Sequence, residues 1–280
     1  MKNSRYEFLV IGAAFIFALN GVIVKLVGAT PVTAMFIRFF IPLLFSLFLV
    51  PNPIKIFKSS LFSKIALFLG LLSVVRAYLF FYGYIHAPLK SAIVLFFVWP
   101  IFAIFVNHFA LKIKLKLNNL LLTFICLCGI ILIFFDSFIL LFSKASILGL
   151  FAMLGAAFLY ALMMPIYKKY VDENSILETI VFQNLWCFIL SLPLILFQTT
   201  NNFQLISLSI YNIFGGWLTF ILYFKALRIL KPTIFNIFTY FEVFFVASIG
   251  IIYFDEKLTP NFFIGALLVI VSSYLARKVD

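Results

Sequence analysis

Charged residues are scarce in this chain, and their scarcity excludes whole classes of protein. Asp, Glu, Lys and Arg together make up 11% of the 280 residues, whereas 65% are hydrophobic. Soluble domains carry about 25% charged residues, and so few charges do not cover a soluble surface of this size. A soluble enzyme and a disordered chain are therefore excluded, and the composition indicates a membrane protein with several spans.

Residues that build metal, disulfide and catalytic sites are also few. The three cysteines, Cys126, Cys128 and Cys187, fall inside apolar runs, and the two histidines, His86 and His108, have no ligand spacing between them. The sequence contains no glycine-rich phosphate loop and no pairing of a nucleophile with a base. We therefore expect no cofactor, no metal ion and no enzymatic activity.

Long apolar runs, by contrast, fill most of the sequence. A helix that crosses a bilayer needs about 20 apolar residues, and runs of this length without alternation are not barrel strands. Prolines or charged residues separate the runs. The predicted fold class is an all-α integral membrane protein with ten transmembrane helices, near residues 8–27, 32–50, 63–85, 91–111, 117–135, 147–167, 176–197, 207–227, 233–254 and 261–276.

The basic residues predict the orientation in the membrane. Lys and Arg number 21 against nine Asp and Glu, so that the formal net charge is +12. If the loops alternate from a cytoplasmic N-terminus, fifteen basic residues lie inside and only four, Lys25, Lys90, Lys144 and Lys257, lie outside. Cytoplasmic loops are enriched in Lys and Arg. We therefore predict a multi-pass protein of the cell inner membrane with both termini cytoplasmic, whose charge marks topology and not a nucleic-acid partner.

The sequence repeats itself at one fixed interval, so that the residue at position 12 recurs at position 155. We call this interval the repeat offset. Seven residues of the first apolar run recur in the sixth: GAAF at 12–15 and at 155–158, AL at 18–19 and at 161–162, and Lys25 at Lys168. Chance recurrence of small residues in apolar helices is the alternative interpretation, but one shared offset favours a true repeat. We expect two five-helix halves, residues 1–140 and 141–280.

Five is an odd number, so the second half enters the membrane from the opposite side. Inverted repeats are typical of transporters that work by alternating access. We therefore interpret the chain as a secondary transporter of a small organic metabolite. Two hypotheses from other classes are a non-transporting structural or assembly subunit and a membrane-embedded enzyme, which requires His, Asp or Cys clustered at a membrane face.

Residues in the last third of the chain carry a resemblance to a known family. They are an Ala-Leu pair at 226–227, Glu242 in the ninth predicted helix, Glu256 in the following loop and Gly265 in the tenth helix, joined by Arg38 in the second. In this pattern the chain resembles the drug/metabolite transporter superfamily, of the EamA type. The resemblance implies two inverted five-helix halves, both termini inside and a central substrate cavity.

The chain departs from that family pattern at two positions. The proline that follows the ninth-helix glutamate is Val243 here, and the loop glutamate of the first half is Ile113. A looser similarity, carried by Tyr-x-Glu at 240–242, the lysine pair at 168–169 and an arginine in the third helix, links the chain to bacterial S-adenosylmethionine uptake carriers. That similarity implies S-adenosylmethionine as one candidate substrate.

Three charged residues fall deep inside the predicted helices and are the leading candidates for a binding site. They are Glu242 and Arg76 near the middle of their helices and Arg38 nearer the outer end of the second. A charge in a span costs about 2.5–3.5 kcal/mol on insertion scales, which makes it a functional candidate. Arg76 would hold a substrate carboxylate in a two-pronged contact, and Glu242 would take a proton or a cationic group. An amino-acid-like substrate carries both groups.

A purely structural interpretation stands beside this one. A buried Arg–Glu pair would only fix helix packing, and Arg38 is long enough to reach the membrane surface. Protons as the coupling ion and a homodimer as the assembly are open hypotheses beside the expected partners, a small-molecule substrate and the lipid bilayer.

Aromatic and amide residues complete the predicted site. Trp99, Tyr160 and Trp217 lie near mid-span and are able to stack on a ring or a cation, although each also suits a bundle core. Asn20 is an amide deep in the first span, where a hydrogen bond inside the bundle is the alternative. Pro100 removes a backbone hydrogen bond from the fourth helix and is the predicted hinge, with a static kink as the alternative.

The ninth predicted helix carries two polar faces. At about 100° per residue, Thr239 shares the face of Glu242, whereas Asn236 and Tyr240 point away from it. Only one face is required to line a cavity, and Tyr240 is kept as the candidate binding residue on the other.

Substitution of the deep charges tests this assignment. We predict that Arg76→Ala or Glu242→Gln abolishes uptake while the protein still inserts, because each removes one charged contact to the substrate. Uptake and membrane content are measured on the same cells. Normal uptake by both variants would contradict the assignment.

Overall fold

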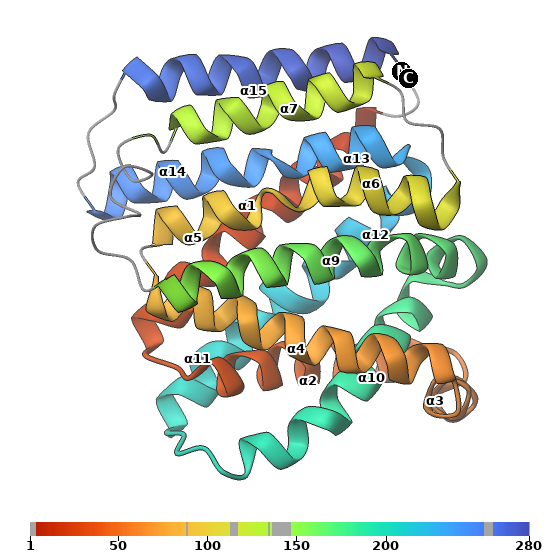
Figure 1. Cartoon of the computed structure of the whole chain (residues 1–280). Helices are drawn as coiled ribbons and strands as arrows, with labels where there is room; N and C mark the ends of the chain where they lie inside the picture. Colours follow the sequence, from red (N-terminus) through yellow and green to blue (C-terminus); the bar gives the residue numbers. More distant parts are fainter. Residues whose placement is uncertain are drawn as a thin grey trace.

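The computed structural model describes residues 4–87, 89–112, 117–133, 135, 147–254 and 260–279, and all regular structure in these ranges is helical (Figure 1). In chain order the helices are α1 (Ser4–Val27), α2 (Pro31–Leu49), α3 (Pro53–Leu61), α4 (Lys64–His86), α5 (Leu89–Phe96), α6 (Trp99–Leu111), α7 (Leu117–Ile133), α9 (Ile147–Glu173), α10 (Ile176–Ile195), α11 (Asn202–Asn212), the π-helix η1 (Ile213–Leu218), α12 (Thr219–Ile229), α13 (Pro232–Thr239), α14 (Phe241–Phe254) and α15 (Pro260–Val279).

Local sequence signals start several of these helices. Thr30 and Ser63 accept a hydrogen bond from a backbone N–H in the first turn of α2 and α4. Ser175 before α10 and Asn201 before α11 each form a reciprocal capping box with the residue three positions later. These side chains satisfy N–H groups that have no partner inside the helix.

The helix boundaries recur at the repeat offset found in the sequence. α1 begins at Ser4 and α9 at Ile147, and α7 begins at Leu117 and α15 at Pro260. The short helices α5 and α13 match at both ends, because their first residues and their last residues are each separated by the repeat offset. These elements therefore have equivalent conformations in the two halves, whereas η1 has no counterpart in the continuous helix α4.

The prediction of ten transmembrane helices is confirmed only in part. Within the described ranges, six helices are long and apolar enough to cross a membrane: Arg5–Val27, Pro31–Leu49, Lys64–His86, Ile147–Glu173, Ile176–Ile195 and Asn202–Ile229. Four further apolar helices are shorter: Ala92–Val106, Leu120–Ile133, Ile234–Val246 and Pro260–Ser272. The predicted fourth and ninth spans are each broken into two α-helices, and the eighth contains η1, because local backbone geometry interrupts the regular hydrogen-bond ladder.

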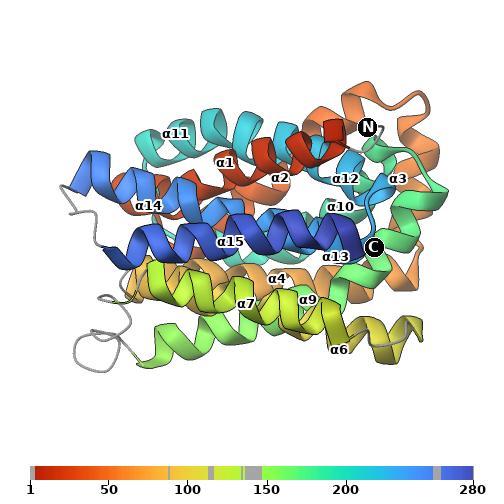
Figure 2. The same cartoon turned by 90° about the horizontal axis from the view of Figure 1, so that it is seen from above.

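The two halves interlock in the bundle. α2 packs on α10 and α7 packs on α15, so the second and fifth segments of each half meet their equivalents. α4 packs on α9 and α1 on α12, which pairs third segments with the first segments of the opposite half (Figures 1 and 2). The interior is thus shared between the halves.

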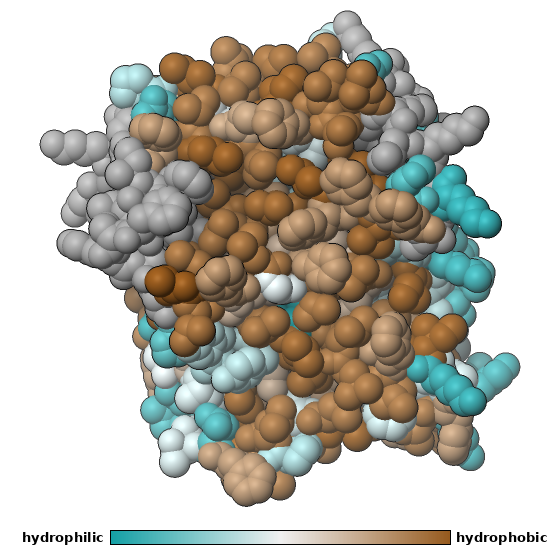
Figure 3. Space-filling model, in the orientation of Figure 1, coloured by the Kyte–Doolittle hydropathy of each residue, from teal (hydrophilic) through white to brown (hydrophobic). Residues whose placement is uncertain are grey.

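The outer surface of the bundle is apolar. Large hydrophobic side chains point outward along the helices, with Phe8 69% exposed and Phe151 68% exposed. In Figure 3 the middle of the visible face is hydrophobic, and hydrophilic side chains gather toward the helix ends. The start of α1 and the end of α15 lie at the same end of the bundle (Figures 1 and 2). This surface suits a lipid environment.

Glycines allow α7 and α15 to approach closely. A Cβ atom built on Gly129 would lie 2.7 Å from the carbonyl oxygen of Gly265, which leaves no room for a methyl group. A Cβ atom on Gly265 would lie 2.8 Å from Ile133. Close backbone approach replaces the missing hydrophobic drive between helices in lipid.

Alanine at these glycines is expected to destabilise the protein. Gly129→Ala or Gly265→Ala should lower the stability in detergent by about 1–3 kcal/mol, because the helices must move apart. The matched control is Gly12→Ala in α1, where the new methyl group would meet only Leu222 at 3.8 Å. Equal thermal unfolding temperatures for all three variants would contradict the close contact.

Candidate functional site

The first structural irregularity is the break between α5 and α6. α5 ends at Phe96, the residue four positions before Pro100, and a turn at Phe97 and Val98 connects it to α6. A proline ring clashes with the carbonyl group four residues earlier and offers no N–H to it. Pro100 therefore explains why the fourth predicted span is interrupted at this point.

The equivalent break between α13 and α14 has no proline. The Thr239 hydroxyl donates to the carbonyl oxygen of Asn236 at 2.6 Å, and the N–H of Tyr240 bonds to Ile237 instead of Asn236. A threonine hydroxyl that bonds within its own helix competes with the backbone and bends the helix. α13 accordingly ends at Thr239, and α14 starts one residue after Tyr240.

The two breaks meet in the interior. Phe97 and Tyr240 occupy equivalent positions, and their ring centroids lie 5.8 Å apart. Discontinuous helices in corresponding positions of two inverted halves are a feature of transporter binding sites.

A cavity lies beside these breaks. Six pairs of equivalent positions, one from each half, contribute to its lining: Phe17 and Tyr160, Asn20 and Met163, Phe80 and Tyr223, Phe81 and Phe224, Phe96 and Thr239, and Trp99 and Glu242. The cavity is therefore formed by both halves around their pseudo-symmetry axis.

The two halves contribute different chemistry to the same positions. Where the first half places a Phe or Trp ring, the second half places a hydroxyl or carboxyl group at four positions: Tyr160, Tyr223, Thr239 and Glu242. The arginines of the lining, Arg38 and Arg76, both come from the first half. The two halves thus line the cavity with different chemical groups, although their helices occupy equivalent positions.

Arg38 is held in place by the surrounding protein. It is 8% exposed, and its Nη1 donates to the carbonyl oxygen of Gly215 in η1. Its guanidinium also lies 5.2 Å from the ring centroid of Phe17 and 4.9 Å from that of Phe220. The wide π-turn exposes the accepting carbonyl, so the irregularity of the eighth segment serves to anchor this charge.

Arg76 has far fewer contacts. Its guanidinium carbon lies 5.6 Å from the ring centroid of Tyr160, and within the described part of the chain it has no hydrogen-bond or ion-pair partner. Its donors are therefore available to a molecule in the cavity, and an arginine binds carboxylate or phosphate oxygens in pairs.

Glu242 and Asn20 are further polar groups of the lining without a partner. They are 8% and 4% exposed, and neither side chain makes a hydrogen bond to another described residue. Glu242 and Arg38 are close enough to interact electrostatically, but no ion pair joins them in the described ranges. The buried Arg–Glu pair that would only fix packing is thus not formed.

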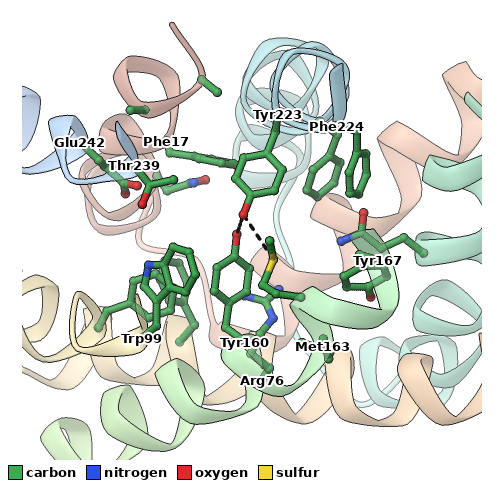
Figure 4. A pocket seen from close by; sticks show the side chains of 18 of the residues that line it. Phe17, Arg76, Trp99, Tyr160, Met163, Tyr167, Tyr223, Phe224, Thr239 and Glu242 are labelled. Atoms are coloured by element: carbon green, nitrogen blue, oxygen red, sulfur yellow. Dashed lines mark hydrogen bonds between the residues drawn. The ribbon is translucent and has the colours of Figure 1, made fainter. Parts of the chain in front are cut away.

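A hydrogen bond between two tyrosines crosses the cavity. The hydroxyls of Tyr160 on α9 and Tyr223 on α12 are hydrogen-bonded to each other. The hydroxyl of Tyr223 also lies 3.4 Å from the sulfur of Met164. Either hydroxyl is able to donate the proton of the bond between the two tyrosines. Figure 4 shows Glu242, Thr239 and Trp99 on one side of this pair and Phe224 and Tyr167 on the other.

Six of the predicted binding residues lie together in this lining: Arg38, Arg76, Glu242, Trp99, Tyr160 and Asn20. Two do not. Trp217 lies in η1 with its ring 5.5 Å from Phe45, and Tyr240 is fully buried against Phe97. The rotation of each helix places these two side chains on faces that the lining does not include.

The sequence interpretation did not select several lining residues, among them Phe17, Phe80, Met163, Tyr167, Gln183 and Tyr223. The repeat pointed to two of these, because Phe17 is equivalent to Tyr160 and Met163 to Asn20. Tyr167 and Gln183 carried no such signal, since their equivalents, Val24 and Phe40, are not in the lining.

Together, the fold and the cavity define a multi-pass helical membrane protein with a chamber lined by both of its repeated halves. The sequence matches the EamA-like transporter family over residues 4–135 and again over 147–277. The chain belongs to this family, whose members are membrane transporters of small molecules and not enzymes.

Other comparisons bear on the fold alone. A solved structure described as "Crystal structure of protein" is similar, with a TM-score of 0.79 and 13% sequence identity over 99% of this chain and 98% of the other. No curated protein sequence matches. The resemblance to S-adenosylmethionine carriers therefore has no support among the relatives found.

Phenylalanine substitutions test the tyrosine pair. Tyr160→Phe and Tyr223→Phe should each cost about 0.5–1.5 kcal/mol of stability, and the double variant should cost less than their sum because both remove the same hydrogen bond. The cycle is measured by thermal unfolding in detergent. Additive losses would show that the hydroxyls are not coupled.

Proposed function

We propose that this chain is a secondary transporter that moves a small organic metabolite across the cell inner membrane by alternating access. In this proposal ten segments cross the membrane with both termini in the cytoplasm, and the halves 1–140 and 141–280 rock around the cavity. One observation carries it: six pairs of equivalent positions line one chamber, beside two equivalent helix breaks. A site on the axis of inverted repeats can be exposed to either face by the same motion.

The unpartnered charges of the chamber indicate the substrate. Arg76 offers donors for a carboxylate, and Glu242 offers an acceptor for an ammonium or other cationic group. Aromatic rings such as Trp99 and Tyr160 surround both groups and exclude water. A zwitterion of amino-acid type fits this arrangement, and S-adenosylmethionine is one larger molecule with the same two groups.

Glu242 also offers a route to energy coupling. A buried carboxylate without a partner is costly, and that cost is removed when a proton or a cationic substrate group binds. The transporter would then change conformation only with the charge compensated. A proton gradient or the substrate gradient itself would supply the energy.

A ligand panel followed by uptake assays tests the function. The purified protein is screened for thermal stabilisation by amino acids and S-adenosylmethionine, where a ligand at about 100 times its Kd adds about 2.7 kcal/mol. The stabilising compound is then assayed in proteoliposomes. Arg76→Lys should weaken binding about tenfold or more, because a bidentate contact is lost, and Trp217→Phe, outside the chamber, is the matched control.

Two outcomes would overturn the proposal. Absence of counterflow for every compound tested would favour a structural or assembly subunit. Equal loss of binding in Arg76→Lys and Trp217→Phe would place the substrate elsewhere.

A further inference from the structure

Two lysines at equivalent positions make equivalent hydrogen bonds at the ends of helices. Lys25, near the end of α1, donates from Nζ to the carbonyl oxygen of Ala87 at 3.1 Å. Lys168, its equivalent in α9, donates from Nζ to the carbonyl oxygen of Arg228 at 2.8 Å. These two lysines are separated by the repeat offset and belong to the seven recurring residues of the first and sixth apolar runs.

The accepting carbonyls belong to equivalent helix ends, although the two residues themselves are not equivalent: Ala87 corresponds to Leu230 and Arg228 to Ile85. Ala87 caps α4 directly after its last residue, and Arg228 is in the last turn of α12. α4 and α12 end at His86 and Ile229, which are again separated by the repeat offset. Carbonyls at a helix C-terminus lack intrahelical partners and favour a positive charge. Each lysine therefore joins the first segment of its half to the end of the third.

The two bonds lie at opposite ends of the chamber. Gly149, at the start of α9, packs against Ala87, where an added Cβ would be 3.2 Å from the Ala87 nitrogen. Lys168 follows nineteen residues later on the same helix, at a distance of about 28 Å. Tyr160 and Met164 of the chamber lining come from α9 between these points.

Among the described residues, the Lys168 end carries further bonds that the repeat does not reproduce at the Lys25 end. Lys168 also pairs with Asp172 at 2.9 Å, and Arg228 donates from Nε to the carbonyl oxygen of Val171 at 2.6 Å and from Nη2 to that of Asn174. The first-half equivalents of Arg228 and Asp172 are Ile85 and Ala29, whose apolar side chains form no such bonds.

We propose that Lys25 and Lys168 are the gate residues of this transporter, each closing one end of the chamber. The inference rests on the proposed function and adds the residues that control access to the site. Each bond lies within one half, but it joins the packed helices α1 and α12 to the packed helices α4 and α9, so a gate opens when these two pairs separate at its end. The structure, with both bonds made, has both gates closed.

Distances between spin labels test the gates without any substrate. In a background that lacks the three native cysteines, one label pair is placed at Leu26 and His86, and the other at Lys169 and Ile229, all exposed positions. Lys25→Gln should raise the open population of the first pair about fivefold to tenfold, and Lys168→Gln that of the second, since each removes a charged hydrogen bond.

The controls separate gating from general stability. Lys→Arg at either position keeps a cationic donor and should restore the closed distances. Lys225→Gln removes an exposed lysine of α12 that makes no hydrogen bond among the described residues, and it should leave both pairs unchanged. A purely structural role would lower the unfolding temperature without an end-specific change of distance.

Each result is decisive. Opening confined to the end whose lysine is replaced supports the gates. No opening in either variant, or opening of both pairs by either variant, overturns them. The spin labels measure opening whether or not the protein transports a substrate. If each end opens as expected but no uptake is found, the proposed function is refuted and the opening of the two ends still stands.

Discussion

Every backbone N–H and C=O group inside a membrane must find a partner within the protein, and the rest of this structure depends on that constraint. Most of the chain meets it with continuous helices. The interruptions occur where other helices surround the backbone: at Phe97 and Val98, at Tyr240 and within η1. Interrupted backbone is tolerated only where it is buried in protein or lines a cavity. The site therefore lies where the helices are broken.

The repeat supplies a frame on which the two halves have diverged. Many helix boundaries recur at the repeat offset, so the frame is shared, but the side chains at equivalent lining positions differ. The first half provides rings and both arginines, and the second provides hydroxyls and the carboxylate. An inverted frame needs only similar helix packing, whereas recognition of an asymmetric substrate needs different groups on opposite walls. The two halves thus differ in chemistry where they line the chamber.

The deep charges differ in how the protein accommodates them. Arg38 is bonded to Gly215 and enclosed by two rings, so it stabilises the junction of α2 with η1 as well as lining the chamber. Arg76 and Glu242 are left without such partners. Glu242 is buried and Arg76 is half-buried, and a charge that lacks a hydrogen-bond or ion-pair partner in such surroundings is costly.

The sequence by itself determined the class of protein, the membrane-length apolar segments, the repeat offset and the three deep charges, because hydropathy and repetition can be read directly from the order of the residues. It also placed Thr239 with Glu242 through helical periodicity. Only the tertiary structure decided that Trp217 and Tyr240 face away from the chamber, that Tyr223 bonds to Tyr160, and that Arg38 rather than Arg76 is anchored. In lipid, hydropathy does not distinguish the faces of an apolar helix. Its rotation is set by packing against neighbours that are distant in sequence.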